Sequence, residues 1–246
     1  MTHHPAQKNS AVRSEIYWQR MSSPIYYWKA YARVVTKGAF WHLTLGLSRS
    51  IKRFLDLVIA TVCLILCIPV FLVIFILIKL DDGGPIFFSQ MRVGYKGVLF
   101  RMYKFRSMVP NAQDLKRDLI DSNEVSGGVI FKMKNDPRIS RIGKILRKYS
   151  IDEIPQFINV LLGEMSLVGP RPCLPEEAGK YRPEDLRRFL AKPGLTCFWQ
   201  IQGRSTLTFD QQIQLDIKYI RSTSMWEDFK ILLRTIPVVI LGKGSY

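Results

Sequence analysis

The sequence predicts an α+β, membrane-associated fold that is mostly helical, with a small β-hairpin or sheet, one re-entrant membrane helix broken by a proline, and interfacial amphipathic helices. Three observations carry this prediction. Residues 57–78 form an uncharged apolar run of 22 residues, Pro69 lies near its centre, and residues 86–108 alternate like a β-hairpin before helical periodicity begins. The chain has 246 residues and a formal net charge of +16, but 48% of its residues are hydrophobic, which excludes a disordered protein.

The apolar run is long enough for a membrane segment, since 22 residues at about 1.5 Å each match a hydrocarbon core of about 30 Å. Pro69 removes one backbone donor and predicts a kink. Both flanks are basic, with Arg49, Lys52 and Arg53 before the run and Lys79, Arg92, Lys96, Arg101, Lys104 and Arg106 after it. Because positive residues favour the cytoplasmic side, we expect residues 49–80 to enter and leave by the same face. A Pro-kinked spanning helix is the alternative.

The run divides the chain into three predicted parts. Residues 1–48 mix tryptophan and tyrosine with lysine and arginine, which favours an N-terminal segment at the membrane interface over an aromatic-rich flexible tail. Residues 49–80 are the predicted membrane helix, and residues 81–246 are the third part, which we expect to lie in the cytoplasm. Of the net charge, +7 lies at or before Asp56, where it would meet anionic lipid.

Within residues 81–246 the pattern predicts a hairpin that turns at 94–97 and a series of helices. The helices are expected near residues 114–120, 139–148, 152–162, 176–190 and 209–221. The apolar stretch 231–242 is interrupted by Arg234 and Pro237 and is too short to span a bilayer, so it is expected to be interfacial or part of the core.

The positions of histidine and cysteine exclude several enzyme classes. His3, His4 and His42 all precede the apolar run, so chemistry after residue 80 proceeds without imidazole. This excludes Ser/His/Asp hydrolases, Cys/His enzymes and histidine-ligated metals. The four cysteines have no zinc spacing. No nucleic-acid-binding motif accompanies the positive charge, so no nucleic-acid partner is expected.

Adjacent carboxylates at Asp152 and Glu153 are the first candidate site. Ser150 and Glu153 have the spacing of a helix capping box, but that register places Pro155 inside the helix, where a hydrogen bond would be lost. We therefore predict a helix with Asp152 as its N-cap. A cap without a catalytic role is the structural alternative.

Cations elsewhere complete the candidate site. The stiff turn at 168–172 directs Arg171, Arg204 follows Gly203, and residues 103–106 form a basic strand. Several cations with one acidic pair, and no histidine, suit phosphoryl transfer with a divalent metal.

Four segments resemble the bacterial sugar transferases, the monotopic phosphoglycosyl transferases. They are KRFLDLVIA (52–60), YKFRSM (103–108), NDPRISRIGKILRKYSIDEIPQFINVLLGEMSLVGPRP (135–172) and KPGLTCFWQIQGRS (192–205). The resemblance covers roughly residues 50–246, and the combination of DE-x-P with VGPRP is highly specific.

The resemblance implies an enzyme of the bacterial inner membrane whose catalytic domain faces the cytoplasm. Such an enzyme transfers a sugar 1-phosphate from a UDP-sugar to undecaprenyl phosphate, releases UMP, and begins the assembly of exopolysaccharide, O-antigen or another glycoconjugate. It also implies that Asp152 is the nucleophile, that Glu153 with Asp152 holds Mg²⁺, and that phosphate is bound by Lys104, Arg147, Arg171 and Arg204. A homodimer is left open.

One departure and three alternatives accompany the resemblance. Many family members have Ser-Pro at the helix break, whereas this chain has Ile68-Pro69. The C-terminal residues resemble those of hexose-transferring members, which favours UDP-glucose or UDP-galactose over an N-acetylated sugar. A second alternative, a glycosyltransferase that moves sugar without phosphate, is disfavoured because no D-x-D motif is present. The third alternative is a non-catalytic, membrane-anchored protein that binds anionic lipid.

Overall fold

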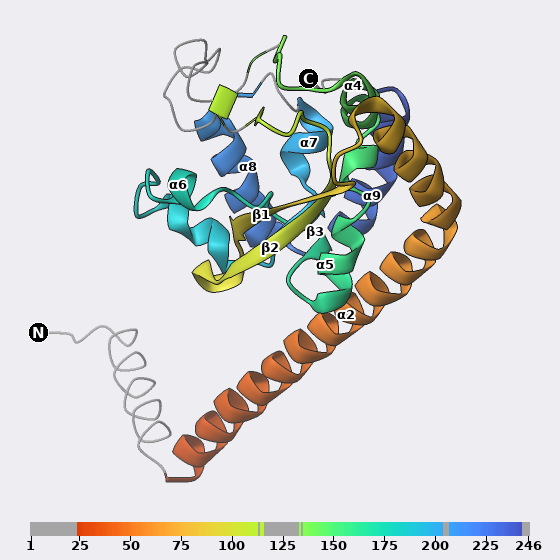
Figure 1. Ribbon diagram of the computed structural model, residues 1–246. Helices are drawn as coiled ribbons and strands as arrows, with labels where there is room; N and C mark the ends of the chain where they lie inside the picture. Colours follow the sequence, from red (N-terminus) through yellow and green to blue (C-terminus); the bar gives the residue numbers. More distant parts are fainter. Residues whose placement is uncertain (1–23, 113, 116–132, 134, 204–206, 243–246) are drawn as a thin grey trace, which may run out of the picture. The chain divides into compact units, whose positions relative to one another are not determined.

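The computed structural model describes residues 24–112, 114–115, 133, 135–203 and 207–242 (Figure 1). The chain divides into two compact units between Ile51 and Lys52, a boundary that falls inside helix α2 (Pro24–Asp82). The second unit is mostly helical and contains two small sheets, as an α+β fold requires. Most of the helix predicted at 114–120 lies outside the described residues.

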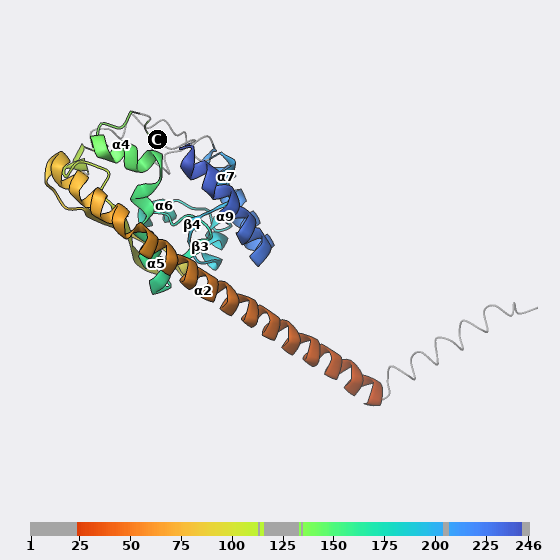
Figure 2. The same cartoon turned by 90° about the vertical axis from the view of Figure 1, so that its right-hand side faces the viewer.

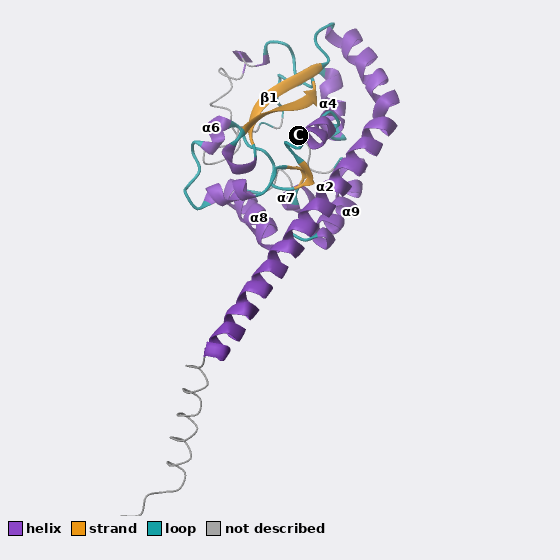
Figure 3. Cartoon of the chain, turned by 90° about the horizontal axis from the view of Figure 1, so that it is seen from below, coloured by secondary structure: helices purple, strands orange, loops and turns teal. Residues whose placement is uncertain are grey.

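Helix α2 contains the apolar run and is continuous through Pro69. Its part from Gly46 to Asp82 contains an 18-residue window with a mean hydropathy of 3.3 and is long and apolar enough to cross a membrane. Large apolar side chains such as Leu66 and Leu72 are exposed along it, so no other part of the described chain covers them. Figures 1 and 3 both show α2 changing direction toward its C-terminal end. An uncovered apolar surface of this length is expected of a helix that lies in lipid.

Three polar side chains at the start of the second unit fix α2 to the rest of that unit. Arg53 donates to the backbone oxygens of Val160 and Leu161, at 2.6 and 2.9 Å. Asp56 is buried and accepts hydrogen bonds from the Ser166 hydroxyl at 2.7 Å and the Leu167 amide at 3.2 Å. Lys52 forms an ion pair with Asp228 of α9. The polar side chains of the KRFLD segment therefore attach the apolar helix to the rest of the second unit.

The predicted hairpin is confirmed as β1 (Phe87–Val93) and β2 (Leu99–Phe105), paired antiparallel with Phe88 opposite Lys104 and Arg92 opposite Phe100. The turn uses Lys96 at φ 55° and Gly97 at φ 81°. One face of the hairpin carries Phe100, Met102 and Lys104, so apolar packing and a charged site side chain share a face.

Of the two helices predicted between residues 139 and 162, the first is confirmed and the second is replaced by two short segments. The helix at 139–148 is confirmed as α4 (Arg141–Lys148), with Ser140 as its N-cap. The single helix over 152–162 with Asp152 as N-cap is wrong. A 3₁₀ turn, η3 (Ile151–Glu153), starts after Ser150 at φ 55°, and helix α5 (Gln156–Leu162) starts after Pro155. Because Pro155 stands at the N-cap, where no backbone N–H is needed, the acidic pair occupies a separate turn.

A two-stranded parallel sheet, β3 (Ser166–Val168) and β4 (Gly194–Thr196), lies beside α5 and α9 (Figure 2). The predicted charged helix at 176–190 is wrong, because Pro183 divides it into α6 (Pro175–Ala178) and the 3₁₀ helix η4 (Asp185–Leu190). Helix α7 (Phe198–Gln202) is followed by α8 (Phe209–Ser222), which confirms the predicted helix at 209–221, and by α9 (Met225–Ile240).

Two apolar clusters hold the second unit together. The larger includes Met102, Val160, Leu167 and Ile231, and the smaller joins Phe105 to Ile74 and Ile78 of α2. The stretch at 231–242 contributes Ile231 to the core, whereas Leu233, Ile236 and Ile240 are exposed, and the interfacial role of the stretch stays a prediction.

Candidate active site

The candidate site gathers two carboxylates and two cations from three parts of the chain. Lys104 of β2 places its Nζ 2.8 Å from Oε1 of Glu153 and 3.4 Å from Oδ2 of Asp152. Arg171, in the loop after β3, places Nη2 2.8 Å from the same Oε1 of Glu153. The structure therefore brings together four of the six residues predicted for catalysis and phosphate binding.

Lys104 is held in place through its strand. The buried Asn159 of α5 accepts a hydrogen bond from the Tyr103 amide at 3.0 Å, and its side-chain amide donates to the Arg101 backbone oxygen at 2.7 Å. This side chain acts like a short piece of a neighbouring strand, because it pairs with a backbone donor and a backbone acceptor of β2. It fixes β2, and with it Lys104, against the segment that carries the acidic pair.

Arg171 is directed by close packing of the loop behind it. A Cβ added at Gly169 would lie 2.2 Å from the Lys192 backbone oxygen, and one at Gly194 would lie 2.0 Å from the Gly169 amide nitrogen. Only glycine fits at either position, so the loop can approach β4 closely. The Arg171 guanidinium also lies 5.9 Å from the centre of the Trp199 ring, a cation–π contact.

The two carboxylates differ in charge behaviour although they are adjacent. Burial raises the pKa of Asp152, with a partly opposing effect from Lys104. Burial would also raise the pKa of Glu153, but the positive charges of Arg171 and Lys104 outweigh it and hold that pKa well below its usual value. Glu153 is thus firmly ionised and paired, whereas Asp152 has the weaker cationic support of the two.

The other two predicted cations have different outcomes. Arg147 lies in α4, and its charge lowers the pKa of Asp152 by less than that of Lys104 does. Its Nη1 is buried and has no hydrogen-bond partner among the described residues, so one donor of this guanidinium is unused there. Arg204 lies outside the described residues.

Sequence reasoning missed three charged side chains behind Arg171. Arg92 of β1 donates to the Pro172 backbone oxygen at 3.3 Å, and burial followed by the charge of Arg171 lowers its pKa. Arg188 of η4 donates to the Arg171 backbone oxygen at 2.7 Å and pairs with Asp216 of α8. The position of Arg92 in the predicted hairpin could have indicated an inward-facing cation. No pattern in the sequence indicates that Arg188 pairs with Asp216, which lies 28 positions away.

A family model described as bacterial sugar transferase matches residues 47–242 of this chain. The chain belongs to the bacterial sugar transferase family. The match confirms the predicted resemblance over nearly the whole of the predicted range. It also confirms that the protein is an enzyme of the sugar transferase class.

Named relatives agree with this family. The chain is 50% identical over 197 residues to "Galactosyl transferase CpsE" of Streptococcus agalactiae, and 41% identical over 203 residues to "Undecaprenyl-phosphate galactose phosphotransferase" of Salmonella typhimurium. These alignments cover 79% and 81% of this chain but 43% and 42% of the relatives, so the chain spans less than half of their length. It is 37% identical to "Exopolysaccharide production protein ExoY" of Rhizobium meliloti, over 79% of this chain and 88% of that protein.

Proposed function

We propose that this sugar transferase moves a hexose 1-phosphate from a UDP-hexose to undecaprenyl phosphate and releases UMP, as the first membrane step in making a bacterial exopolysaccharide or related glycan. The observation that carries the proposal is the buried Asp152 beside a Glu153 that Lys104 and Arg171 both hold. The printed names of the relatives, which include a galactose phosphotransferase acting on undecaprenyl phosphate, support the same donor and acceptor classes.

The proposed chemistry has two displacements at one phosphorus atom. A carboxylate oxygen of Asp152 attacks the phosphorus that carries the sugar, the bond from that phosphorus to the bridging oxygen breaks, and UMP leaves with the electron pair. A phosphate oxygen of undecaprenyl phosphate then attacks the same phosphorus and displaces the Asp152 carboxylate. A covalent intermediate lets a water-soluble donor and a lipid acceptor use one site in turn.

The cations supply the charge that this reaction needs. Nucleophile and donor are both anionic, so an attack on phosphorus requires positive groups near the developing charge. Lys104 and Arg171 lie at the acidic pair, and Arg147 has a buried, unpartnered Nη1. We assign phosphate binding to these three residues and to Arg204.

Glu153 and Asp152 also suit the Mg²⁺ that the family implies. Among the described residues no group of three or more His, Cys, Asp or Glu side chains gathers as a metal site. Mg²⁺ needs only one or two protein carboxylates, because phosphate oxygens and water complete its octahedron. The position of Lys104 between the two carboxylates already places a positive charge there. The ion would neutralise phosphate charge, and Glu153 would hold it with Asp152.

The membrane helix would keep the site where the lipid acceptor's phosphate lies. The uncovered apolar surface of α2 and its attachment through Arg53 and Asp56 support a location at the bilayer. We propose the inner membrane, with residues 49–80 re-entrant and the catalytic domain in the cytoplasm, because both flanks of the apolar run are basic.

A donor screen tests this function. Purified protein with undecaprenyl phosphate and Mg²⁺ is given UDP-glucose, UDP-galactose or an N-acetylated UDP-sugar, and the released nucleotide is measured. We expect UMP with a hexose donor, loss of release in Asp152→Asn, and normal release in Asp210→Asn, which changes an exposed aspartate. Release of UDP would indicate a glycosyltransferase that leaves the phosphate behind. Release of no nucleotide with any donor would overturn the proposal.

A further inference from the structure

A buried ion pair lies directly behind the loop that presents Arg171. The Arg188 and Asp216 side chains are 7% and 1% exposed, and Nη2 of Arg188 lies 2.7 Å from Oδ2 of Asp216. The angle of this contact falls short of a hydrogen bond, so the attraction is between charges. Burial raises the pKa of Asp216 to about 6 despite Arg188. Such a pair is costly to bury, and a hydrophobic pair of similar size would serve packing at least as well.

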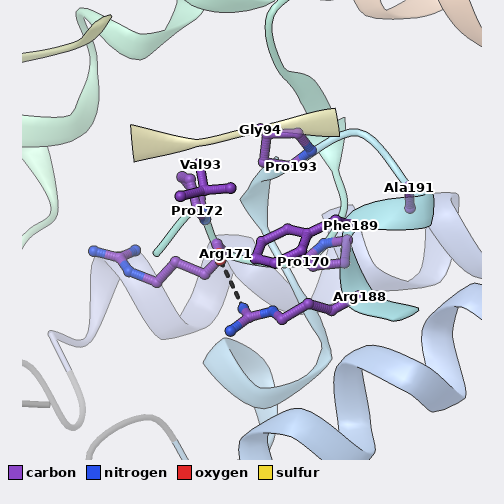
Figure 4. A pocket seen from close by; sticks show the side chains of 9 residues that line it. All are labelled: Val93, Gly94, Pro170, Arg171, Pro172, Arg188, Phe189, Ala191 and Pro193. Atoms are coloured by element: carbon purple, nitrogen blue, oxygen red, sulfur yellow. Dashed lines mark hydrogen bonds between the residues drawn. The ribbon is translucent and has the colours of Figure 1, made fainter. Parts of the chain in front are cut away.

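The remaining contacts of Arg188 lead to the active site. Its Nη2 also donates to the Arg171 backbone oxygen at 2.7 Å, and its Nη1 donates to the Tyr181 hydroxyl at 2.6 Å. Figure 4 shows Arg188 reaching the Arg171 backbone while the Arg171 guanidinium extends in another direction. The hollow between them, lined also by Pro170, Pro172 and Phe189, has a volume of about 10 Å³. Both arginines thus line the same small hollow beside the loop.

Nearby contacts act on the same short stretch of backbone. Arg92 donates to the oxygen of Pro172, and the Val93 amide donates to the oxygen of Cys173 at 3.0 Å. Gly169 is fixed against β4 through its amide, which donates to Thr196 at 3.0 Å. Consecutive carbonyls on one side of the loop are thus held by donors from η4 and β1, and only Arg188 holds that of Arg171 among the described residues.

We propose that Arg188, kept charged and oriented by Asp216, is a positioning residue that sets the backbone of Arg171 so that the guanidinium reaches Glu153. The inference rests on the proposed function, in which Arg171 binds phosphate. Asp216, Arg188, Arg171 and Glu153 form a continuous chain of contacts from α8 to the acidic pair. A group displaced by about 1 Å can cost about 100-fold in rate, so a support one contact away from phosphate can be strongly felt.

The test separates positioning from general stability. In a paired replacement, Arg188→Met with Asp216→Leu, the buried charges are exchanged for apolar groups, which is often neutral or stabilising for the fold. Arg188→Lys is a milder variant that keeps the charge but loses the planar fork. Arg187→Lys makes the same change at the exposed neighbour and is the control. Melting temperature, kcat/KM and amide hydrogen exchange of Gly169, Arg171 and Cys173, the three residues of the loop with a backbone N–H, are measured for each.

We expect the paired replacement to keep its melting temperature, to lose about 10- to 100-fold in kcat/KM, and to exchange the amides of Gly169, Arg171 and Cys173 faster. In an Arg171→Lys background the same replacement should cost less than about twofold, because residues in one network are not additive. Full activity of the paired replacement and of Arg188→Lys, with unchanged amide exchange, overturns the proposal. An equal loss of kcat/KM in the wild-type and Arg171→Lys backgrounds overturns it too. If the wild-type protein transfers no sugar phosphate, the proposed function fails, and hydrogen exchange alone then decides whether the pair positions the loop.

Discussion

At the scale of single residues, Asp152 and Glu153 share one short turn but have opposite electrostatic surroundings. Both are largely buried, yet Glu153 has two cations at 2.8 Å whereas Asp152 has one at 3.4 Å. The negative charge of Asp152 is less neutralised by cations, so this carboxylate is the more reactive of the two as a nucleophile. Glu153, paired with two cations, is the more suitable residue to hold a further cation. The division of labour between nucleophile and metal ligand is consistent with this difference.

This asymmetry predicts opposite stability changes for two isosteric substitutions. Because the folded-state pKa of Asp152 is raised, its ionised form at neutral pH costs stability, and Asp152→Asn should raise the melting temperature by about 2–4 °C. The pKa of Glu153 is lowered, so its ionised form contributes stability above its ordinary pKa, and Glu153→Gln should cost about 2–3 kcal/mol. Thermal and urea unfolding measure both. Equal shifts of the same sign would contradict the assignment.

The raised pKa of Asp152 also predicts a pH dependence. Transfer should fall as pH decreases through that pKa, because a protonated carboxyl is not a nucleophile. Lys104 lowers the pKa of Asp152, so Lys104→Met should move the acidic limb of the kcat/KM profile to higher pH as well as slow transfer. Lys144→Met, an exposed change in α4, is the control. A limb that stays in place or moves to lower pH would show that Asp152 does not govern it.

At the scale of elements, the hairpin and α5 form the frame of the site. Asn159 has no exposed surface and bridges a backbone donor and a backbone acceptor of β2. It also donates to Glu164 at 2.6 Å, so one side chain links β2, α5 and the turn that follows α5. The packing of β2 against α5 thus depends on one polar side chain, Asn159, among apolar neighbours.

Asn159→Ala should therefore cost about 2–3 kcal/mol of unfolding free energy, since two buried backbone groups lose their partner. It should also lower transfer, because Lys104 is next to the residue whose amide is released. Asn135→Ala, at an exposed turn, should stay within about 0.5 kcal/mol of the wild type. Denaturant unfolding compares the two. A loss below about 1 kcal/mol for Asn159→Ala would contradict the bridging role.

Periodicity predicted the hairpin, α4 and α8, where one pattern extends over a whole element. It failed where proline decides between registers. Pro155 and Pro183 divide helices that apolar spacing alone would join, and the separate turn at 151–153 depends on Ser150 adopting a positive φ. At the site, motif residues were predictable, but Arg188 and Asp216 were not, because their pairing exists only after η4 and α8 have packed together.

At the scale of the whole molecule, the apolar surface and the positive charge belong to different parts of the chain. The apolar surface is concentrated on α2, of which the most apolar window is 11% buried. Polar side chains at Arg53 and Asp56 attach that helix to α5 and β3, the elements that lead into the site. Insertion of α2 into a bilayer would thereby set the distance of the site from lipid.

The proposed re-entrant topology rests on the basic flanks of the apolar run. A re-entrant helix predicts that cysteines introduced at Ser48 and Leu80, both exposed, are labelled by a membrane-impermeant maleimide in inverted vesicles and not in spheroplasts. The background carries alanine at the four native cysteines. Labelling of one of the two cysteines in spheroplasts and of the other in inverted vesicles would indicate a spanning helix.

Trapping the covalent intermediate tests the central claim most directly. Wild-type protein is incubated with UDP-hexose and Mg²⁺ without lipid acceptor, and peptide mass spectrometry locates any added hexose phosphate. The proposed mechanism predicts one hexose phosphate on Asp152, none in Asp152→Asn, and its disappearance when undecaprenyl phosphate is added. Normal turnover by Asp152→Asn, or an adduct on another residue, would contradict it.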